Sequence, residues 1–138
     1  MKRLFSVLVL VLLIVALLTA AAPTPQVKFT LVQGLPEAPD VMNVGDQATV
    51  IVDVTSDQPF LSAQGMPSFY YPGKGVVAVQ GGDHAGSGTS ARLEITYMAK
   101  SSTAKMAGGV APVHAVIGIR YPGGYIALQD YVFYVTVP

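Results

Sequence analysis

Two tyrosine-bearing turns are the residues of this sequence best suited to recognise a ligand. Tyr70 and Tyr71 precede a Pro-Gly pair, and Tyr121 and Tyr125 flank Pro122-Gly123-Gly124. Tyrosine offers a rigid ring with a polar tip, which suits contacts with sugars or with proteins. Tyrosines at such turns can instead close the ends of a hydrophobic core. The four tyrosines are therefore candidate binding residues, with the alternative that Tyr71 and Tyr121 only seal the core.

Metal binding has few candidate residues. His84 lies in a Gly-rich loop beside Asp83, His114 alternates with apolar residues, and the absence of cysteine removes the usual blue-copper ligand set. Loop carboxylates bind Ca²⁺ in many extracellular domains, and four aspartates fall in expected loops: Asp40, Asp46, Asp57 and Asp83. Single loop aspartates more often cap turns through their own backbone. We expect no metal and no cofactor.

Catalytic residues are equally sparse. No Gly-x-Ser-x-Gly elbow occurs, and Gly86-Ser87-Gly88 lies in a flexible-looking loop rather than in a strand–turn–helix context. Glu37 and Glu94 are the two glutamates, and alternation places Glu94 on an outward, solvated strand face. The sequence therefore predicts a protein that is not an enzyme.

The N-terminus has the three parts of an export signal. Lys2 and Arg3 precede an apolar run over residues 4–18, and small residues follow at 19–22. We expect cleavage after Ala21 and a secreted or cell-envelope location. The alternative is an uncleaved membrane anchor, because residues 4–22 approach the length that spans a bilayer. The mean hydropathy of +0.51 is raised by this run.

The charge balance argues against nucleic acid as a partner. The whole chain has eight basic and eight acidic residues; without Lys2 and Arg3, six basic residues face eight acidic ones, a formal charge of −2. Nucleic-acid binding requires a concentrated basic face. A membrane is an expected partner only if the N-terminal segment is retained.

After residue 22 the hydrophobic residues recur with a period of two, which indicates strands. The expected strand faces are Val27, Phe29 and Leu31; Ala48, Val50, Val52 and Val54; Leu93, Ile95 and Tyr97; Val113, Ala115, Ile117 and Ile119; and Tyr131, Phe133, Val135 and Val137. We expect turns at 56–59 and 121–124 and a mobile loop at 81–90. About seven strands separated by Gly/Pro turns predict an all-β, antiparallel β-sandwich after an N-terminal signal helix.

Several of these positions carry a family resemblance. Val44-Gly45-Asp46 precedes the Val-rich strand, Gly88 precedes the strand that ends in Tyr97, a Gly pair stands at 123–124, and residues 131–137 close the chain. Residues 41–138 thus resemble the Ig-like domains of bacterial and archaeal surface-layer and cell-surface proteins, the CARDB-type group. Val44-Gly45-Asp46 and Tyr70-Tyr71-Pro72 also resemble the start of a cohesin. The resemblance implies an adhesive, spacer or assembly module without catalytic residues.

The resulting division is a signal peptide at 1–21, an N-terminal segment with the first strand at 22–40, and an Ig-like β-sandwich at 41–138. The predicted function is the binding of an envelope or extracellular protein, through an exposed edge strand at 26–33 or at the end of the chain. The alternative is a carbohydrate-binding module that uses the tyrosine turns, although the absence of Trp weakens it.

Overall fold

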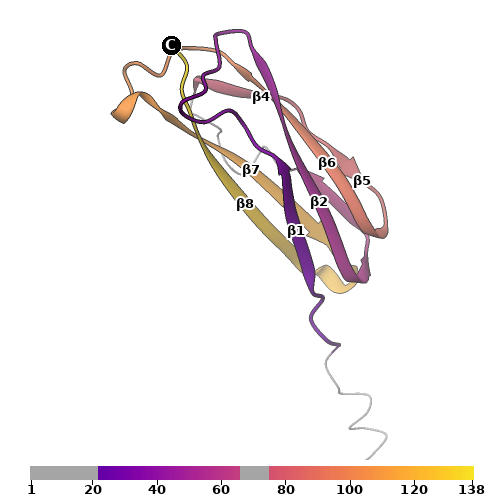
Figure 1. Cartoon of the computed structure of the whole chain (residues 1–138). Coiled ribbons are helices and arrows are strands. Elements are labelled where there is room, and N and C mark those ends of the chain that lie inside the picture. Colours follow the sequence, from indigo (N-terminus) through magenta and orange to yellow (C-terminus); the bar gives the residue numbers. More distant parts are fainter. Residues whose placement is uncertain (1–21, 66–74) are drawn as a thin grey trace, which may run out of the picture.

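The computed structural model describes residues 22–65 and 75–138. The expected signal peptide at 1–21, with its signal helix, and the candidates Tyr70 and Tyr71 lie outside the described residues. Eight strands form two antiparallel sheets that pack face to face (Figure 1). They are β1 (Val27–Gln33), β2 (Gln47–Phe60), β3 (Ser62–Gly65), β4 (Val77–Gly81), β5 (His84–Ala85), β6 (Gly88–Ala99), β7 (Ala111–Arg120) and β8 (Ile126–Val135).

The strand order confirms the all-β sandwich, with eight described strands where about seven were expected. The first sheet has the order β1-β2-β6-β4 and the second has the order β5-β3-β7-β8. β1 is thus an edge strand of the first sheet, and β8 is an edge strand of the second. No helix in residues 22–65 and 75–138 has the length and apolar character needed to cross a bilayer.

The alternation read from the sequence forms the core. Val50, Val52 and Val54 of β2 are fully buried, as are Leu93, Ile95 and Tyr97 of β6 in the same sheet. The second sheet contributes Val113, Ala115, Ile117 and Ile119 of β7 to the same cluster. β-branched residues fit such a pleated, half-buried surface. One contiguous core therefore fills the space between the sheets.

Two local expectations were wrong. The segment Ser56-Asp57-Gln58-Pro59 does not turn the chain but continues β2, whose pairing with β6 shifts register between Thr55 and Phe60. Pro59 is tolerated there because the ladder is interrupted at this irregularity. The stretch 81–90 is not one mobile loop, because β5 pairs with β3 and β6 begins at Gly88.

Candidate binding surfaces

Tyr121 seals one end of the sandwich. Its side chain is 2% exposed, and its hydroxyl shares a 2.7 Å hydrogen bond with Ser56 Oγ of β2. Phe60 meets the Tyr121 ring edge to face, with ring centroids 6.5 Å apart. The structure therefore places Tyr121 in the core, where it contributes a contact between the end of β7 and β2.

Tyr125, in contrast, presents its ring to solvent. It is 45% exposed and lies against Tyr121, with ring centroids 5.7 Å apart and planes inclined by 42°. Its carbonyl accepts the Tyr121 N–H at 2.9 Å across the turn. Gly123 and Gly124, with φ of 83° and 90°, adopt the left-handed conformation that favours glycine. The turn thus brings two of the four candidate tyrosines together, one buried and one exposed.

A cleft of about 500 Å³ opens beside Tyr125. Its walls include four prolines as well as both tyrosines, and the full lining is Ala22, Pro23, Thr24, Pro25, Gln58, Pro59, Tyr121, Pro122 and Tyr125. Hydrogen bonds hold the N-terminal wall in place: Gln58 Nε2 donates to the Pro23 carbonyl at 3.0 Å, and the Gln26 N–H donates to Asp57 Oδ1 at 2.8 Å. This Tyr–Pro cleft is therefore a mainly apolar hollow, with its N-terminal wall attached to the end of β2 by these two hydrogen bonds.

A second candidate surface is the free edge of β8. The four edge strands differ in length: β5 has two residues, β4 has five, β1 has seven and β8 has ten. The pairing of β1 is also interrupted by a register shift between Leu31 and Gln33. The pairing of β7 with β8 runs without a register shift from Ala111↔Val135 to Arg120↔Ile126. Proteins protect sheet edges with short strands, bulges or charges. β8 is the longest and most regular edge in the described chain.

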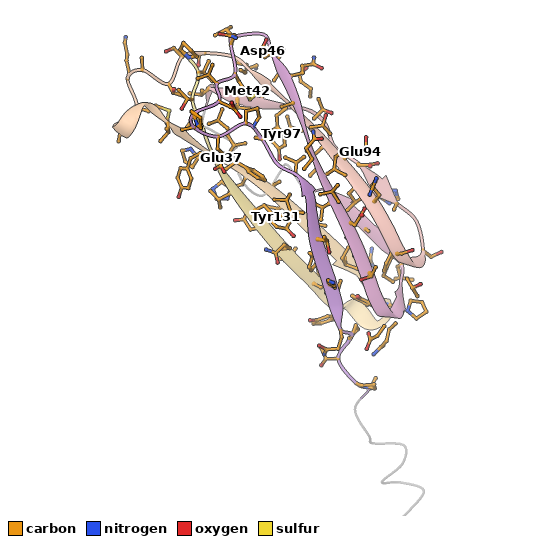
Figure 2. All side chains as sticks on the ribbon, in the orientation of Figure 1. Glu37, Met42, Asp46, Glu94, Tyr97 and Tyr131 are labelled. Carbon is orange, nitrogen blue, oxygen red and sulfur yellow. The ribbon has the colours of Figure 1, made fainter. Side chains whose placement is uncertain are left out.

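One end of this edge is capped by the segment between β1 and β2. Glu37 Oε1 accepts the Tyr134 N–H at 2.7 Å, and the Met42 N–H donates to the Thr136 carbonyl at 3.0 Å. Figure 2 shows Glu37 and Met42 at the end of the sandwich away from the N-terminal trace. Within residues 22–65 and 75–138, no strand pairs with the outer edge of β8. The edge from Ile126 to Val132 is therefore left open.

The outer face of β8 is apolar as well. The outward apolar side chains are Ile126, Leu128, Val132 and Tyr134, which are between 40% and 60% exposed, and Asp130 is the one charged residue among them. Asp130 is bound by His114 of β7, whose Nδ1 lies 2.9 Å from Oδ2. Contiguous exposed apolar side chains of this kind mark interaction surfaces.

The outer face of the first sheet differs in character. Arg92 of β6 donates to both carboxylate oxygens of Asp53 on β2, at 2.7 and 2.9 Å, and these bonds lower the pKa of Asp53. The Thr49 and Thr96 hydroxyls lie 3.2 Å apart on the same two strands. Glu94 is exposed on this face, as alternation predicts (Figure 2). The first sheet thus presents a polar outer face to solvent, whereas the second sheet presents the apolar edge strand β8.

Three of the four aspartates considered for calcium accept hydrogen bonds from backbone amides. Asp46 Oδ2 accepts the Asn43 N–H, Asp57 Oδ1 accepts the Gln26 N–H, and Asp83 accepts the N–H groups of His84 and Glu94. Each carboxylate therefore has a structural role in fixing a turn or a strand pair. In the part of the chain that the structure describes, no three His, Asp or Glu side chains gather as a metal-ion site.

The outer face of β8 is the feature that sequence reasoning missed. Only the inward set was assigned to a face: Tyr131, Phe133, Val135 and Val137. The opposite face of β8 carries Ile126, Leu128, Val132 and Tyr134. A strand with apolar side chains on both faces is usually buried on both faces. The sequence of residues 126–135 shows this pattern.

Comparison with protein-family models gives no match to this sequence, and comparison with curated proteins gives none either.

Proposed function

We propose that this protein is a non-catalytic module, exported to the cell envelope or secreted, that binds a protein partner through the open edge of β8. The observation that carries the proposal is the combination, on one strand, of a backbone edge that no strand of the described chain pairs with and an apolar outer face from Ile126 to Val132. An extended segment added to such an edge gains main-chain hydrogen bonds and side-chain contacts at once. The resemblance to cell-surface Ig-like domains supports the same class of function.

Site-specific photo-crosslinking in the native envelope tests this proposal. A photoreactive amino acid replaces Leu128 in the full chain, and a matched variant carries it at Glu94, which is exposed on the polar sheet. We expect a defined protein adduct from position 128 and none from position 94, and we expect Val132→Lys to remove that adduct. Equal labelling from both positions, or no protein adduct from either, would refute an edge-binding role.

The Tyr–Pro cleft favours a second candidate function, the binding of a carbohydrate. The exposed Tyr125 ring stands beside a cleft of about 500 Å³, and amphipathic aromatic rings suit sugar faces. Binding of envelope polysaccharide that is lost in Tyr125→Ala and retained in Leu128→Lys would support this function. Retention in Tyr125→Ala would remove the cleft from consideration.

A further inference from the structure

The open edge of β8 has a hydrogen-bonding pattern that a second copy of the same strand can complete. The Tyr134 N–H points away from β7, because it donates to Glu37. Residues of an antiparallel strand alternate in the direction of their backbone groups, and the β7–β8 register is continuous. Ile126, Leu128, Asp130 and Val132 therefore direct their N–H and C=O groups to the same free edge as Tyr134.

We propose that two copies of the chain associate by antiparallel pairing of β8 with β8, centred on Gln129. The proposal rests on the proposed function and deepens it, because it names the partner at the edge as a second copy of this chain. A two-fold axis places the β8 edge of one copy against the β8 edge of the other, so each residue pair off the axis occurs twice across the interface. The pairing joins the second sheets of both copies into one continuous sheet and removes both open edges.

The Glu37 cap selects the register. A pair centred on Asp130 or on Tyr131 requires the Tyr134 N–H, which Glu37 already accepts at 2.7 Å. Centring on Asp130 also places that carboxylate opposite its own copy, and like charges directly opposite are destabilising. Among the symmetric registers that keep the Glu37 contact, the one centred on Gln129 pairs the longest stretch, Ile126–Val132.

The side chains fit this register. Ile126 of one copy lies opposite Val132 of the other, so the exposed apolar side chains at both ends of the paired stretch cover each other. Leu128 lies opposite Asp130, whose carboxylate is bound by His114 of its own chain. Gln129 Nε2 donates to the Asp130 carbonyl at 3.2 Å, the long end of the usual range. In the paired register the incoming N–H of Leu128 replaces this long contact to the Asp130 carbonyl.

Cysteine cross-linking tests the register directly, because the chain contains no cysteine. Residues directly opposite in a non-hydrogen-bonded antiparallel pair have Cα atoms about 4.5 Å apart, which a disulfide can bridge. We expect the full chain with Gln129→Cys to form a disulfide-linked dimer under mild oxidation. In the same register the two copies of residue 130 are diagonal neighbours about 7–8 Å apart, so Asp130→Cys should stay monomeric on a non-reducing gel, as should Glu94→Cys on the other sheet.

Sedimentation of the cysteine-free chain provides the second measurement. We expect a dimer for the wild type and for Glu94→Lys, and a monomer for Leu128→Lys with an unchanged circular dichroism spectrum. A monomeric wild type, or cross-linking of Asp130→Cys or Glu94→Cys in place of Gln129→Cys, would overturn the proposal. If position 128 meanwhile cross-links a different protein in the envelope, edge binding stands and self-pairing alone fails.

Discussion

At the scale of single residues, Thr103 illustrates how one side chain can fix the end of a chain. It is a buried polar residue, 1% exposed. Its hydroxyl donates to the Gly109 carbonyl at 2.6 Å and accepts the Val137 N–H at 2.9 Å, while its own N–H donates to the Val137 carbonyl at 2.8 Å. The connection between β6 and β7 is thereby attached to the end of β8.

Thr103→Val should lower the free energy of unfolding by about 1–3 kcal/mol. The substitution keeps the shape but leaves the buried Val137 N–H without an acceptor, and an unpaired buried group costs that amount. Urea unfolding measures the change. Ser102→Ala is the matched control: the exposed Ser102 hydroxyl accepts the nearby Ala104 N–H, and its removal should change stability by less than about 0.5 kcal/mol. Equal effects of the two substitutions would contradict this role of Thr103.

Gly65 is a second residue whose identity packing determines. A Cβ at this position would lie 2.5 Å from Ile95 Cδ1 and 2.6 Å from Ile95 Cγ1. Because Ile95 is fully buried in the core, Gly65→Ala should destabilise the protein by about 1–3 kcal/mol, the usual cost of overpacking. Gly81→Ala, where no heavy atom lies within 4 Å of the added Cβ, should cost much less. Thermal unfolding of both variants checks this: a larger loss of stability in Gly65→Ala than in Gly81→Ala indicates overpacking against Ile95, whereas equal losses indicate a general effect of replacing glycine in a strand.

At the scale of elements, strand faces were predictable and strand boundaries less so. The alternation of Val50, Val52 and Val54 identified the core face of β2, since period-two patterns depend only on local geometry. The continuation of β2 through Pro59 depends on a bulge opposite β6, and the two-residue β5 depends on β3. Both are pairings between distant segments, which local composition does not encode.

The candidate site was predictable to a similar extent. The Pro-Gly-Gly sequence after Tyr121 identified the turn, because positive φ there requires glycine. The sequence did not decide which tyrosine is buried, since that depends on Ser56 and Phe60 approaching from β2. The prediction that the last strand forms an edge is confirmed by the sheet order. Its capping by Glu37, 97 residues away in sequence, depends on the path of the chain between β1 and β2.

The Glu37 cap on β8 should be visible in amide hydrogen exchange. Glu37→Ala removes the acceptor of the Tyr134 N–H, and the loss of about 1.4 kcal/mol for a charge-assisted bond corresponds to about tenfold faster exchange of that amide. Phe133, whose N–H is directed to β7, is the internal control and should not change. Glu37→Gln keeps an acceptor oxygen and should give an intermediate rate. Unchanged exchange at Tyr134 in Glu37→Ala would show that this contact does not protect the edge.

At the scale of the whole molecule, hydrogen bonds of buried tyrosines connect the two sheets in addition to the apolar core. Ser56 of the first sheet bonds Tyr121 at the end of the second, and the hydroxyl of Tyr97 on β6 donates to the His114 carbonyl on β7 at 2.7 Å. Figure 2 shows Tyr97 between the two sheets. A chain without cysteine has no disulfide to replace such contacts, so sheet association depends on the core and on these bonds.

Tyr97 makes this sheet association sensitive to alkaline pH. Its side chain is 1% exposed, and burial, followed by the charge of Asp130, raises its pKa above the ordinary value of about 10. The folded protein keeps Tyr97 protonated where the unfolded chain ionises it. This contribution to stability is therefore complete below about pH 10 and falls as the pH rises further, by up to about 1.4 kcal/mol per pH unit.

Tyr97→Phe should separate two contributions of Tyr97 to the free energy of unfolding, that of its hydrogen bond and that of the ionisation of its hydroxyl. At pH 7 the variant should be less stable by about 1 kcal/mol, because the hydrogen bond from the Tyr97 hydroxyl to the His114 carbonyl is lost. Above pH 10 the wild type should lose stability faster than the variant, so the difference between them should narrow in urea unfolding at pH 7, 10 and 11. Tyr131, whose pKa burial also raises, leaves a residual slope in both proteins. Tyr134→Phe, at an exposed position, is the control, and its stability should follow that of the wild type. If the stability difference between the wild type and Tyr97→Phe stays constant from pH 7 to 11, the alkaline transition cannot be assigned to Tyr97.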